Sequence, residues 1–418
     1  MNKKTIRDVD FKDRRVLMRV DFNVPLQNGN VADDTRIKAA LPSIRHIREQ
    51  GAKSIVLMSH LGRPKGKASA DMSLKPVSRR LAELLGIEVA FVPDCIGAEA
   101  EKAVEGLSGG AILLLENLRF HPEEEGKPDI SRDAGDDEKA AAKKEMKEKQ
   151  KAFAKELAKL GDVYVNDAFG TAHRAHASMA VVTGLFEERV AGFLLEKEIE
   201  YLGNAVANPE RPFAAIIGGA KITGKIDVLM SLADKVDTLM IGGAMAYTFY
   251  LAKGLPVGSS LVEEEKVDLA RETLDKIEKS GIRFFLPVDH VTARSLDKDS
   301  EHKVVGEKEI EEGWIGVDIG PETVKLYGKE ISKARTVVWN GPMGCFEVEP
   351  FAAGTTETGK AIAENSKCTS IIGGGDTASA VNQAGLADSM THISTGGGAS
   401  LEFLEGKELP GVAALSDK

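Results

Sequence analysis

Cationic and hydrogen-bonding side chains end the apolar runs in the first half of this chain. Arginines that gather without an anion repel one another, and their planar guanidinium groups suit bidentate hydrogen bonds to phosphate or carboxylate. Such a set predicts a site for a small ligand that carries both groups, although any one of these arginines could instead be an ordinary surface residue. The residues are Asp21, Asn23, Arg36, His60, Arg63, Arg119, His173 and Arg174.

Two of these side chains, His60 and His173, could alternatively act as acid–base groups. No Ser–His–Asp or Cys–His arrangement accompanies them in the sequence, so there is no sign of a protein nucleophile. The sequence leaves the binding and acid–base interpretations of the two histidines open.

Glycine clusters end the apolar runs in the second half of the chain. Bare backbone at a strand end suits a nucleotide phosphate, because several N–H groups can point at one anion. Since ligands of open α/β sheets bind at the carboxyl ends of the strands, the two halves predict two lobes with two anionic ligands, as in a phosphotransferase. The runs are FAAIIGGAK (213–221), TLMIGGAM (238–245), TVVWNGPMG (336–344), TSIIGGGDT (369–377) and HISTGGGAS (392–400).

Residues 219–226 match the P-loop pattern G-x-x-x-x-G-K-[ST] in all but the last position. That position holds the magnesium-binding hydroxyl in a true P-loop, and here it is the apolar Ile226. Lys221 and Lys225 are four residues apart, so they would share one helical face if a helix begins there, with an anion between them. The alternative is a plain strand-to-helix turn with two exposed lysines.

Asp376 is the candidate ligand for magnesium. It follows the glycines 373–375 at a predicted strand end, and Thr377 could cap the next helix. An aspartate at a helix start can also be only a cap, so both interpretations stay open.

The composition is typical of a globular α/β protein. With 418 residues the chain is long enough for two domains, and its 42% hydrophobic and 29% charged residues exclude a fibrous or disordered class. A net charge of −10 argues against nucleic acid as the main partner. The three cysteines are scattered and predict neither zinc nor disulfides, which fits the cytoplasm. No signal peptide or membrane span is expected.

Short apolar runs alternate with amphipathic stretches, which predicts βαβ units and parallel sheets. Ser73 is expected to cap a helix that contains Pro76 in its first turn and ends at Gly86, and the preceding helix is expected to end at Gly51. The polar segment 121–150 is expected to be a solvated surface loop that continues into a helix ending near Gly161.

The ordered set of motifs closely resembles the phosphoglycerate kinase family over nearly the whole chain. Each motif alone is of moderate specificity, whereas their order is highly specific. The tail LPGVAAL (409–415) also resembles the family's, which returns to the N-terminal lobe. The motifs are RVDFNVP (19–25), TRI (35–37), SHLGRP (59–64), LENLRF (115–120), NDAFGTAHRAHAS (166–178), GGAK (218–221), GGAMAYTF (242–249), NGPMGCFE (340–347), GGGDT (373–377) and STGGGASLE (394–402).

The resemblance implies reversible, magnesium-dependent phosphoryl transfer between ATP and the carboxylate of 3-phosphoglycerate. It assigns the triose to Asp21, Phe22, Asn23, Arg36, His60, Leu61, Gly62, Arg63, Arg119 and Arg174. It assigns the nucleotide to Gly218, Gly219, Lys221, Lys225, Gly243, Gly316, Asn340, Pro342, Glu347, Gly373, Gly374, Gly375, Asp376 and Thr377, with Asp376 on the metal. The implied catalytic positions are Arg36, Lys221, Gly375 and Gly398.

The resemblance also implies two similar lobes, each a mainly parallel, doubly wound sheet flanked by helices. We expect a triose lobe over 1–192 with the tail 403–418 packed on it, a connecting helix over 193–207, and a nucleotide lobe over 208–402. The expected protein is a cytoplasmic monomer that closes its lobes around ADP or ATP and the triose, without nucleic-acid or membrane partners.

Two features depart from the usual family pattern. The segment 121–150 is longer, and we expect a surface excursion without new chemistry. ITGK (222–225) replaces a commoner polar pair before the second lysine, which affects the expected nucleotide affinity. A nucleotide-binding oxidoreductase and a non-catalytic protein of the same fold are the alternatives, but no strand is followed by a convincing G-x-G-x-x-G with its acidic residue.

Overall fold

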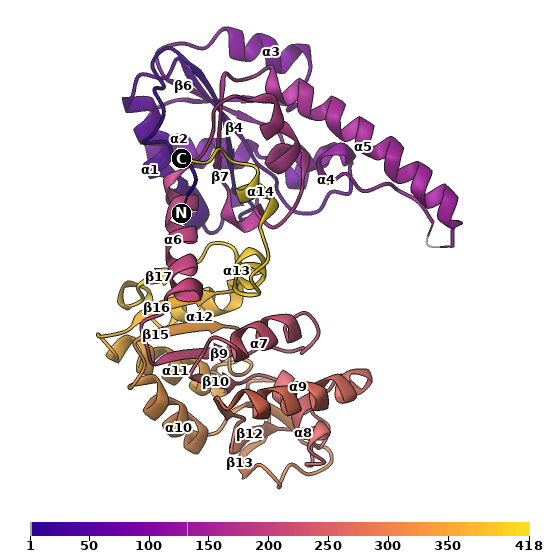
Figure 1. Cartoon of the computed structure of the whole chain (residues 1–418), viewed down its shortest axis with the longest axis vertical. Coiled ribbons are helices and arrows are strands. Elements are labelled where there is room, and N and C mark those ends of the chain that lie inside the picture. The colour runs from indigo at the N-terminus through magenta and orange to yellow at the C-terminus, as the bar shows by residue number, and fades with distance from the viewer. Residues whose placement is uncertain (1, 132) are drawn as a thin grey trace. The chain divides into compact units, whose positions relative to one another are not determined.

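The computed structural model describes residues 2–131 and 133–418, which form two compact units (Figure 1). The first runs to Glu200 and includes Glu408–Lys418, and the second is Tyr201–Lys407. Each unit is built on a six-stranded sheet in which all neighbouring strands are parallel. The predicted fold class, α/β with two mainly parallel sheets flanked by helices, is therefore confirmed.

The first sheet has the strand order β5-β6-β4-β1-β7-β8. Its first strand in the sequence lies between two later ones, so the chain departs from it in both directions, and such a switch point opens a crevice at the carboxyl ends of the strands. A short hairpin, β2–β3, follows this strand. The bounds are β1 (Arg15–Val20), β2 (Leu26–Gln27), β3 (Asn30–Val31), β4 (Ser54–Met58), β5 (Val89–Val92), β6 (Ala111–Leu115), β7 (Val163–Asp167) and β8 (Arg189–Ala191).

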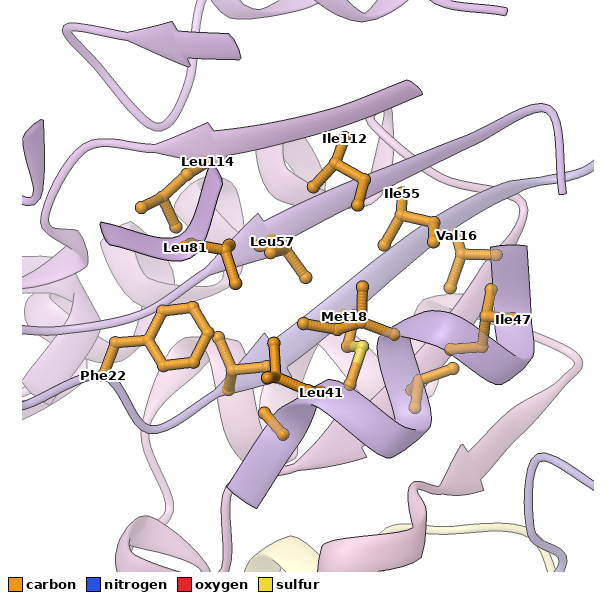
Figure 2. Packing of buried hydrophobic residues seen from close by; sticks show 14 of the residues in the cluster. Val16, Met18, Phe22, Leu41, Ile47, Ile55, Leu57, Leu81, Ile112 and Leu114 are labelled. Carbon is orange, nitrogen blue, oxygen red and sulfur yellow. The ribbon is translucent and has the colours of Figure 1, made fainter. Parts of the chain in front are cut away.

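Alternate side chains of these strands pack with residues of two helices, and Figure 2 labels several members of this buried cluster. Val16 and Met18 of β1 pack with Leu41 and Ile47 of α1 and with Leu81 of α2, all of them buried. The period of two in a strand places the intervening residues on the other face. The helices of this unit are α1 (Thr35–Glu49), α2 (Lys75–Leu85), α3 (Ala98–Glu105), α4 (Pro122–Glu125), α5 (Asp136–Ala158) and α14 (Pro410–Ala413), together with the start of α6 (Phe193–Ala207).

The predicted helix ends are nearly right. Helix α2 ends at Gly86, whose φ of 70° is the left-handed cap that favours glycine, and Pro76 lies in the first turn. Ser73 was expected as the N-cap, but Leu74 occupies that position; the Ser73 hydroxyl still accepts from the Lys75 N–H at 3.2 Å.

The polar segment 121–150 is not only a solvated loop. It contains the one-turn helix α4, in which Glu124 is completely buried, and most of α5. Helix α5 buries Gln150, Phe153, Ala154 and Leu157, all in its second half. The prediction of a solvated face therefore holds for the start of α5 and is wrong for Glu124.

The second sheet has the order β11-β10-β9-β15-β16-β17, with a switch point at β9. A separate antiparallel sheet, β13-β12-β14, was not expected from the sequence. The strands are β9 (Phe213–Ile217), β10 (Thr238–Ile241), β11 (Arg283–Phe285), β12 (Asp289–Ala293), β13 (His302–Gly306), β14 (Ile315–Ile319), β15 (Thr336–Asn340), β16 (Thr369–Gly373) and β17 (His392–Ile393). The helices are α7 (Ile226–Ala233), α8 (Met245–Ala252), α9 (Val267–Ser280), α10 (Pro321–Ile331), α11 (Ala353–Glu364), α12 (Gly375–Gln383) and α13 (Gly397–Leu404).

The compact units divide inside α6, which matches the helix expected over 193–207. The predicted tail began at 403, whereas residues up to Lys407 group with the second unit, where the Ser231 hydroxyl donates to the Leu404 carbonyl at 3.0 Å. Which ligand each lobe binds stays a prediction at this point. Within the described ranges, none of the helices has the length and apolar character of a membrane span.

Candidate active site

The loops that follow β1, β4, β6 and β7 surround a cavity of about 420 Å³ in the first unit. We call its polar lining the cationic edge. Four arginines meet there, as the sequence predicted, and with them most of the other residues assigned to the triose. The lining residues are Asp21, Asn23, Arg36, His60, Gly62, Arg63, Arg119, Glu125, Lys127, Gly170, Thr171, His173 and Arg174.

Arg36 is held in place by groups at the end of β1. Its guanidinium donates to the Asn23 carbonyl at 2.9 Å and lies 3.4 Å from the Asp21 carboxylate. Asp21 itself accepts from the Asn23 N–H at 3.2 Å. The half-buried guanidinium is thus oriented before any ligand arrives, which reduces the entropy that binding must spend.

Asn117 holds the loop after β4. Its side-chain amide accepts from Leu61 N–H at 3.1 Å and donates to the Leu61 carbonyl at 2.7 Å. Gly62 is fixed from both sides, since its N–H donates to Asn23 Oδ1 at 2.9 Å and its carbonyl accepts from Arg119 at 2.8 Å. Phe22 and Leu61 do not line the cavity; both are buried behind it and support the loops.

Sequence reasoning missed Glu125 and Lys127, which belong to the segment 121–150 that was expected to carry no chemistry. The Glu125 carboxylate lies 3.1 Å from Arg119 Nε, so α4 places a counter-charge at the cationic edge. The run HPEEEG directly after the Arg119 motif was the available signal, but runs of charge usually lie in solvent.

The histidines at the cationic edge are neutral at physiological pH. Burial lowers the pKa of His173 to about 4, with a further contribution from the nearby Arg174. Burial also lowers the pKa of His60 well below its ordinary value, and Arg19 and Arg119 act in the same direction. A ring whose pKa lies well below 7 is uncharged and so cannot serve as a general acid, and it is also a weak general base, so the structure argues against the acid–base interpretation.

The glycine turns of the second unit pack against each other, and we call this region, formed by the turns after β9, β10, β15, β16 and β17, the glycine edge. A Cβ on Gly218 would lie 2.1 Å from the Pro342 carbonyl oxygen, and one on Gly243 would lie 2.5 Å from Gly219 N. Gly341 has a φ of 97°, and a Cβ there would lie 2.2 Å from the Gly218 oxygen. Only glycine permits three turns at these distances.

This packing corrects the expectation that the turns offer bare N–H groups to phosphate. The Gly218 N–H donates to Asn340 O at 2.9 Å, that of Gly219 to Pro342 O at 3.0 Å, and that of Gly243 to Met343 O at 2.8 Å. Donors that are engaged inside the protein cannot also point at an anion. These glycines therefore bring chain segments together, and their N–H groups are not available to an anion.

The two predicted lysines do not share a helical face, because α7 begins only at Ile226. Lys221 is exposed, whereas Lys225 extends its ammonium to the Gly218 carbonyl and lies 3.3 Å from Asn340 Oδ1. Burial lowers the pKa of Lys225 to about 8, and the charge of Asp376 opposes this shift. The two residues thus offer one exposed cation and one that is held by hydrogen bonds.

Helices α12 and α13 begin close together at the glycine edge. A Cβ on Gly397 would lie 2.8 Å from Gly374 Cα, so the two turns are in contact. Gly375 is the first residue of α12, and Gly398 is the second of α13. The first N–H groups of a helix have no acceptor inside it and favour negative charge, so these starts are the available anion sites.

The remaining residues predicted for the nucleotide are divided between structural and exposed positions. The Thr377 hydroxyl is buried and accepts from Gly341 N–H at 2.7 Å, so it holds a turn. Gly316 lies on the antiparallel sheet, where a Cβ would clash with the Tyr247 hydroxyl. Asp376 and Glu347 are exposed, and the buried Asn340 Nδ2 has no partner among the described residues.

Comparison with known proteins decides the family. A family model described as phosphoglycerate kinase matches residues 6–407. The chain belongs to the phosphoglycerate kinase family. The predicted family and the enzyme class, a phosphotransferase with a carboxyl group as acceptor, are therefore confirmed.

Relatives in the family match over their full length. A phosphoglycerate kinase from Chloroherpeton thalassium is 55% identical over 100% of both chains, and one from Clostridium tetani is 52% identical over 100% of this chain and 98% of its own. A solved phosphoglycerate kinase from Coxiella burnetii superimposes with a TM-score of 0.83 at 38% identity, covering 99% of this chain and 98% of that one. The one from Pyrococcus horikoshii OT3 gives 0.81 at 34% identity with the same coverage.

Proposed function

We propose that the chain transfers a phosphoryl group reversibly between ATP and the carboxylate of 3-phosphoglycerate, in glycolysis or gluconeogenesis. The products of the forward step are ADP and 1,3-bisphosphoglycerate. The observation that carries the proposal is the cavity in which Arg36, Arg63, Arg119 and Arg174 meet. A small ligand with a phosphate at one end and a carboxylate at the other would satisfy these charges.

The neutral histidines fit this reaction. The attacking carboxylate of the triose is already ionised at neutral pH, so no general base is required. One carboxylate oxygen attacks the γ-phosphorus of ATP in line as the bond to the β-phosphate oxygen breaks, and the electron pair leaves with ADP. Catalysis then depends on position and on stabilising the charge of the transferring group.

We assign that stabilisation to groups from both units. Arg36 would contact the carboxylate end of the triose, and Lys221, whose side chain is exposed, would follow the migrating phosphoryl oxygens. The helix starts at Gly375 and Gly398 would direct their N–H groups at the same charge. Lys225 would hold nucleotide phosphate.

Magnesium is assigned to Asp376. The carboxylate is exposed at the start of α12 and its charge acts on Lys225, which suits a hard cation held by one carboxylate together with nucleotide phosphates. When bound, the ion would neutralise phosphate charge and fix the nucleotide's orientation. Ile226, the position of the failed P-loop match, offers no oxygen for this purpose.

We further propose that the protein is a cytoplasmic monomer that closes when both substrates are bound. Transfer requires the two anions to meet, and exclusion of water would protect the acyl phosphate from hydrolysis. Light scattering after size exclusion tests the monomer. A radius of gyration that falls only with both ligands present tests the closure.

The test of the reaction is an assay of ADP formation from ATP, 3-phosphoglycerate and magnesium. We expect turnover that requires all three components and stops when EDTA is added. An absence of turnover in protein whose circular dichroism shows it to be folded would overturn the proposal. Nicotinamide reduction without any phosphate acceptor would instead favour the oxidoreductase alternative.

A further inference from the structure

Glu124 is a completely buried carboxylate on the one-turn helix α4. It accepts two hydrogen bonds from Ser178: one from the backbone N–H at 3.0 Å and one from the hydroxyl at 2.6 Å. His176 Nδ1 lies 3.7 Å from the same carboxylate. A buried carboxylate without a cationic partner is costly, so a nearby counter-ion is required.

That counter-ion is Arg19, on β1, whose side chain is also completely buried. Its Nε donates to the Ser178 hydroxyl at 2.8 Å, and a second nitrogen donates to the Val20 carbonyl. The Ser178 hydroxyl accepts from Arg19 and donates to Glu124, so it links guanidinium to carboxylate in one direction. Burial raises the pKa of Glu124, and attraction to Arg19 opposes this shift by favouring the charged carboxylate.

The third guanidinium nitrogen of Arg19 contacts a residue in the wall of the substrate cavity. It lies 3.3 Å from Nδ1 of His60, a residue that lines the cavity. A guanidinium can only donate, so Nδ1 must be the acceptor nitrogen of the ring. Because the imidazole is neutral, its single ring proton is then on Nε2. The buried Arg19 thus determines the tautomer of a histidine that lines the substrate cavity.

We propose that Glu124 is a positioning residue of the triose site: through Ser178 it holds Arg19, and Arg19 keeps the His60 proton on Nε2. The role in substrate binding rests on the proposed function, whereas the tautomer does not. Without the carboxylate, Arg19 would be an uncompensated buried cation whose charge also acts on Arg119, and we expect it to move toward solvent or an anion.

The first measurement needs no substrate. In protein labelled with ¹⁵N-histidine, we expect the ring of His60, assigned with H60Q, to show the Nε2–H tautomer. Glu124→Gln should mix the tautomers, and Glu124→Asp should largely restore the original signal. Glu123→Gln, the same change one residue earlier in α4, is the matched control and should leave the ring unchanged.

The second measurement is kinetic. Glu124→Gln should raise KM for 3-phosphoglycerate about tenfold or more, the size of a lost hydrogen bond to a charged group, and leave KM for ATP unchanged. If that variant does not fold, Ser178→Ala breaks the same link and keeps the carboxylate. An Nδ1–H tautomer in the native protein, or native tautomer and KM in a folded link-breaking variant, would refute the proposal. If these variants lose the Nε2–H tautomer but the native protein shows no activity with 3-phosphoglycerate, the link from Glu124 to His60 would stand and only the proposed function would be refuted.

Discussion

The cationic edge and the glycine edge occupy equivalent positions, at the carboxyl ends of two parallel sheets, but they are constructed differently. At the cationic edge, loops stand apart around a cavity and present side chains that other side chains hold in place. At the glycine edge, the turns after β9, β10 and β15 touch backbone to backbone and engage one another's N–H groups.

This difference shows that a shared fold position does not imply a shared mode of binding. Where the loops are open, side chains such as Arg36, in the first turn of α1, and Arg119, after β6, line a cavity, so their chemistry indicates what kind of ligand would fit there. A glycine indicates only that another group lies too close for a side chain. At Gly218 and Gly243 that group is the backbone of a neighbouring turn and not a ligand.

The largest effect is expected from the two cations assigned to the transferring group, one from each edge. Arg36→Ala and Lys221→Ala should each lower kcat by about 10²- to 10³-fold, because a preorganised donor to the transition state is lost, with smaller changes in KM. Steady-state kinetics with both substrates varied would measure this, with the exposed Lys149→Ala on α5 as control. Near-normal turnover in either variant would remove that residue from its assigned role.

The packing of the turns predicts a loss of stability at the glycine edge. Gly218→Ala forces a Cβ against the Pro342 carbonyl, and we expect the free energy of unfolding to fall by about 1–3 kcal/mol or more. Urea denaturation would measure it. The control is Gly328→Ala in α10, where the nearest atom is 3.8 Å away and a gain of about 0.5–1 kcal/mol is expected. Equal stability of the two variants would show that the turns can separate freely.

Thr377 tests whether a residue predicted for the nucleotide is instead structural. Thr377→Val keeps the shape and leaves the Gly341 N–H without its acceptor, which should cost about 1–2 kcal/mol of unfolding free energy. Thr377→Ser keeps the hydroxyl and should lose less. A Val variant of native stability with a raised KM for ATP would return Thr377 to the nucleotide site.

The smallest expected effect is the uptake of a fraction of a proton by Lys225 when nucleotide binds. Its pKa is about 8, below the ordinary 10.5, because the ammonium is buried; a bound phosphate would favour the charged form and raise the pKa again. Nucleotide binding should therefore take up protons at pH 8–9 and none at pH 6.5, where the side chain is charged in both states. Calorimetry in buffers of different ionisation enthalpy measures this uptake, which Lys225→Arg should abolish. Uptake that is independent of pH would contradict the assignment.

Much of the fold was predictable, because long apolar runs with clear ends define β1, β4, β6 and β9. The antiparallel sheet was not predicted: β13 is largely exposed and its alternation is weak, so pairing with β12 decides its structure.

The site was predictable where single residue types carry the chemistry, as with the arginines of the cavity. It was not predictable where the burial of a residue depends on a partner far away in the sequence. Glu124 looks like part of a solvated acidic run, and only contact with Ser178, far along the chain, buries it. Likewise, the sequence could not distinguish glycines that bind phosphate from those that pack on each other, because the three-dimensional pairing of turns settles the question.

Helix α5 is anchored at one end only, since its buried side chains lie between Gln150 and Leu157. The turns before Gln150 bury no side chain, and an exposed pair just before it, Lys149 with Glu145, contributes little. Amide hydrogen exchange should therefore slow progressively from Asp136 toward Ala158. Limited proteolysis should begin near the start of the helix, and the length of that overhang can vary without disturbing the sheet.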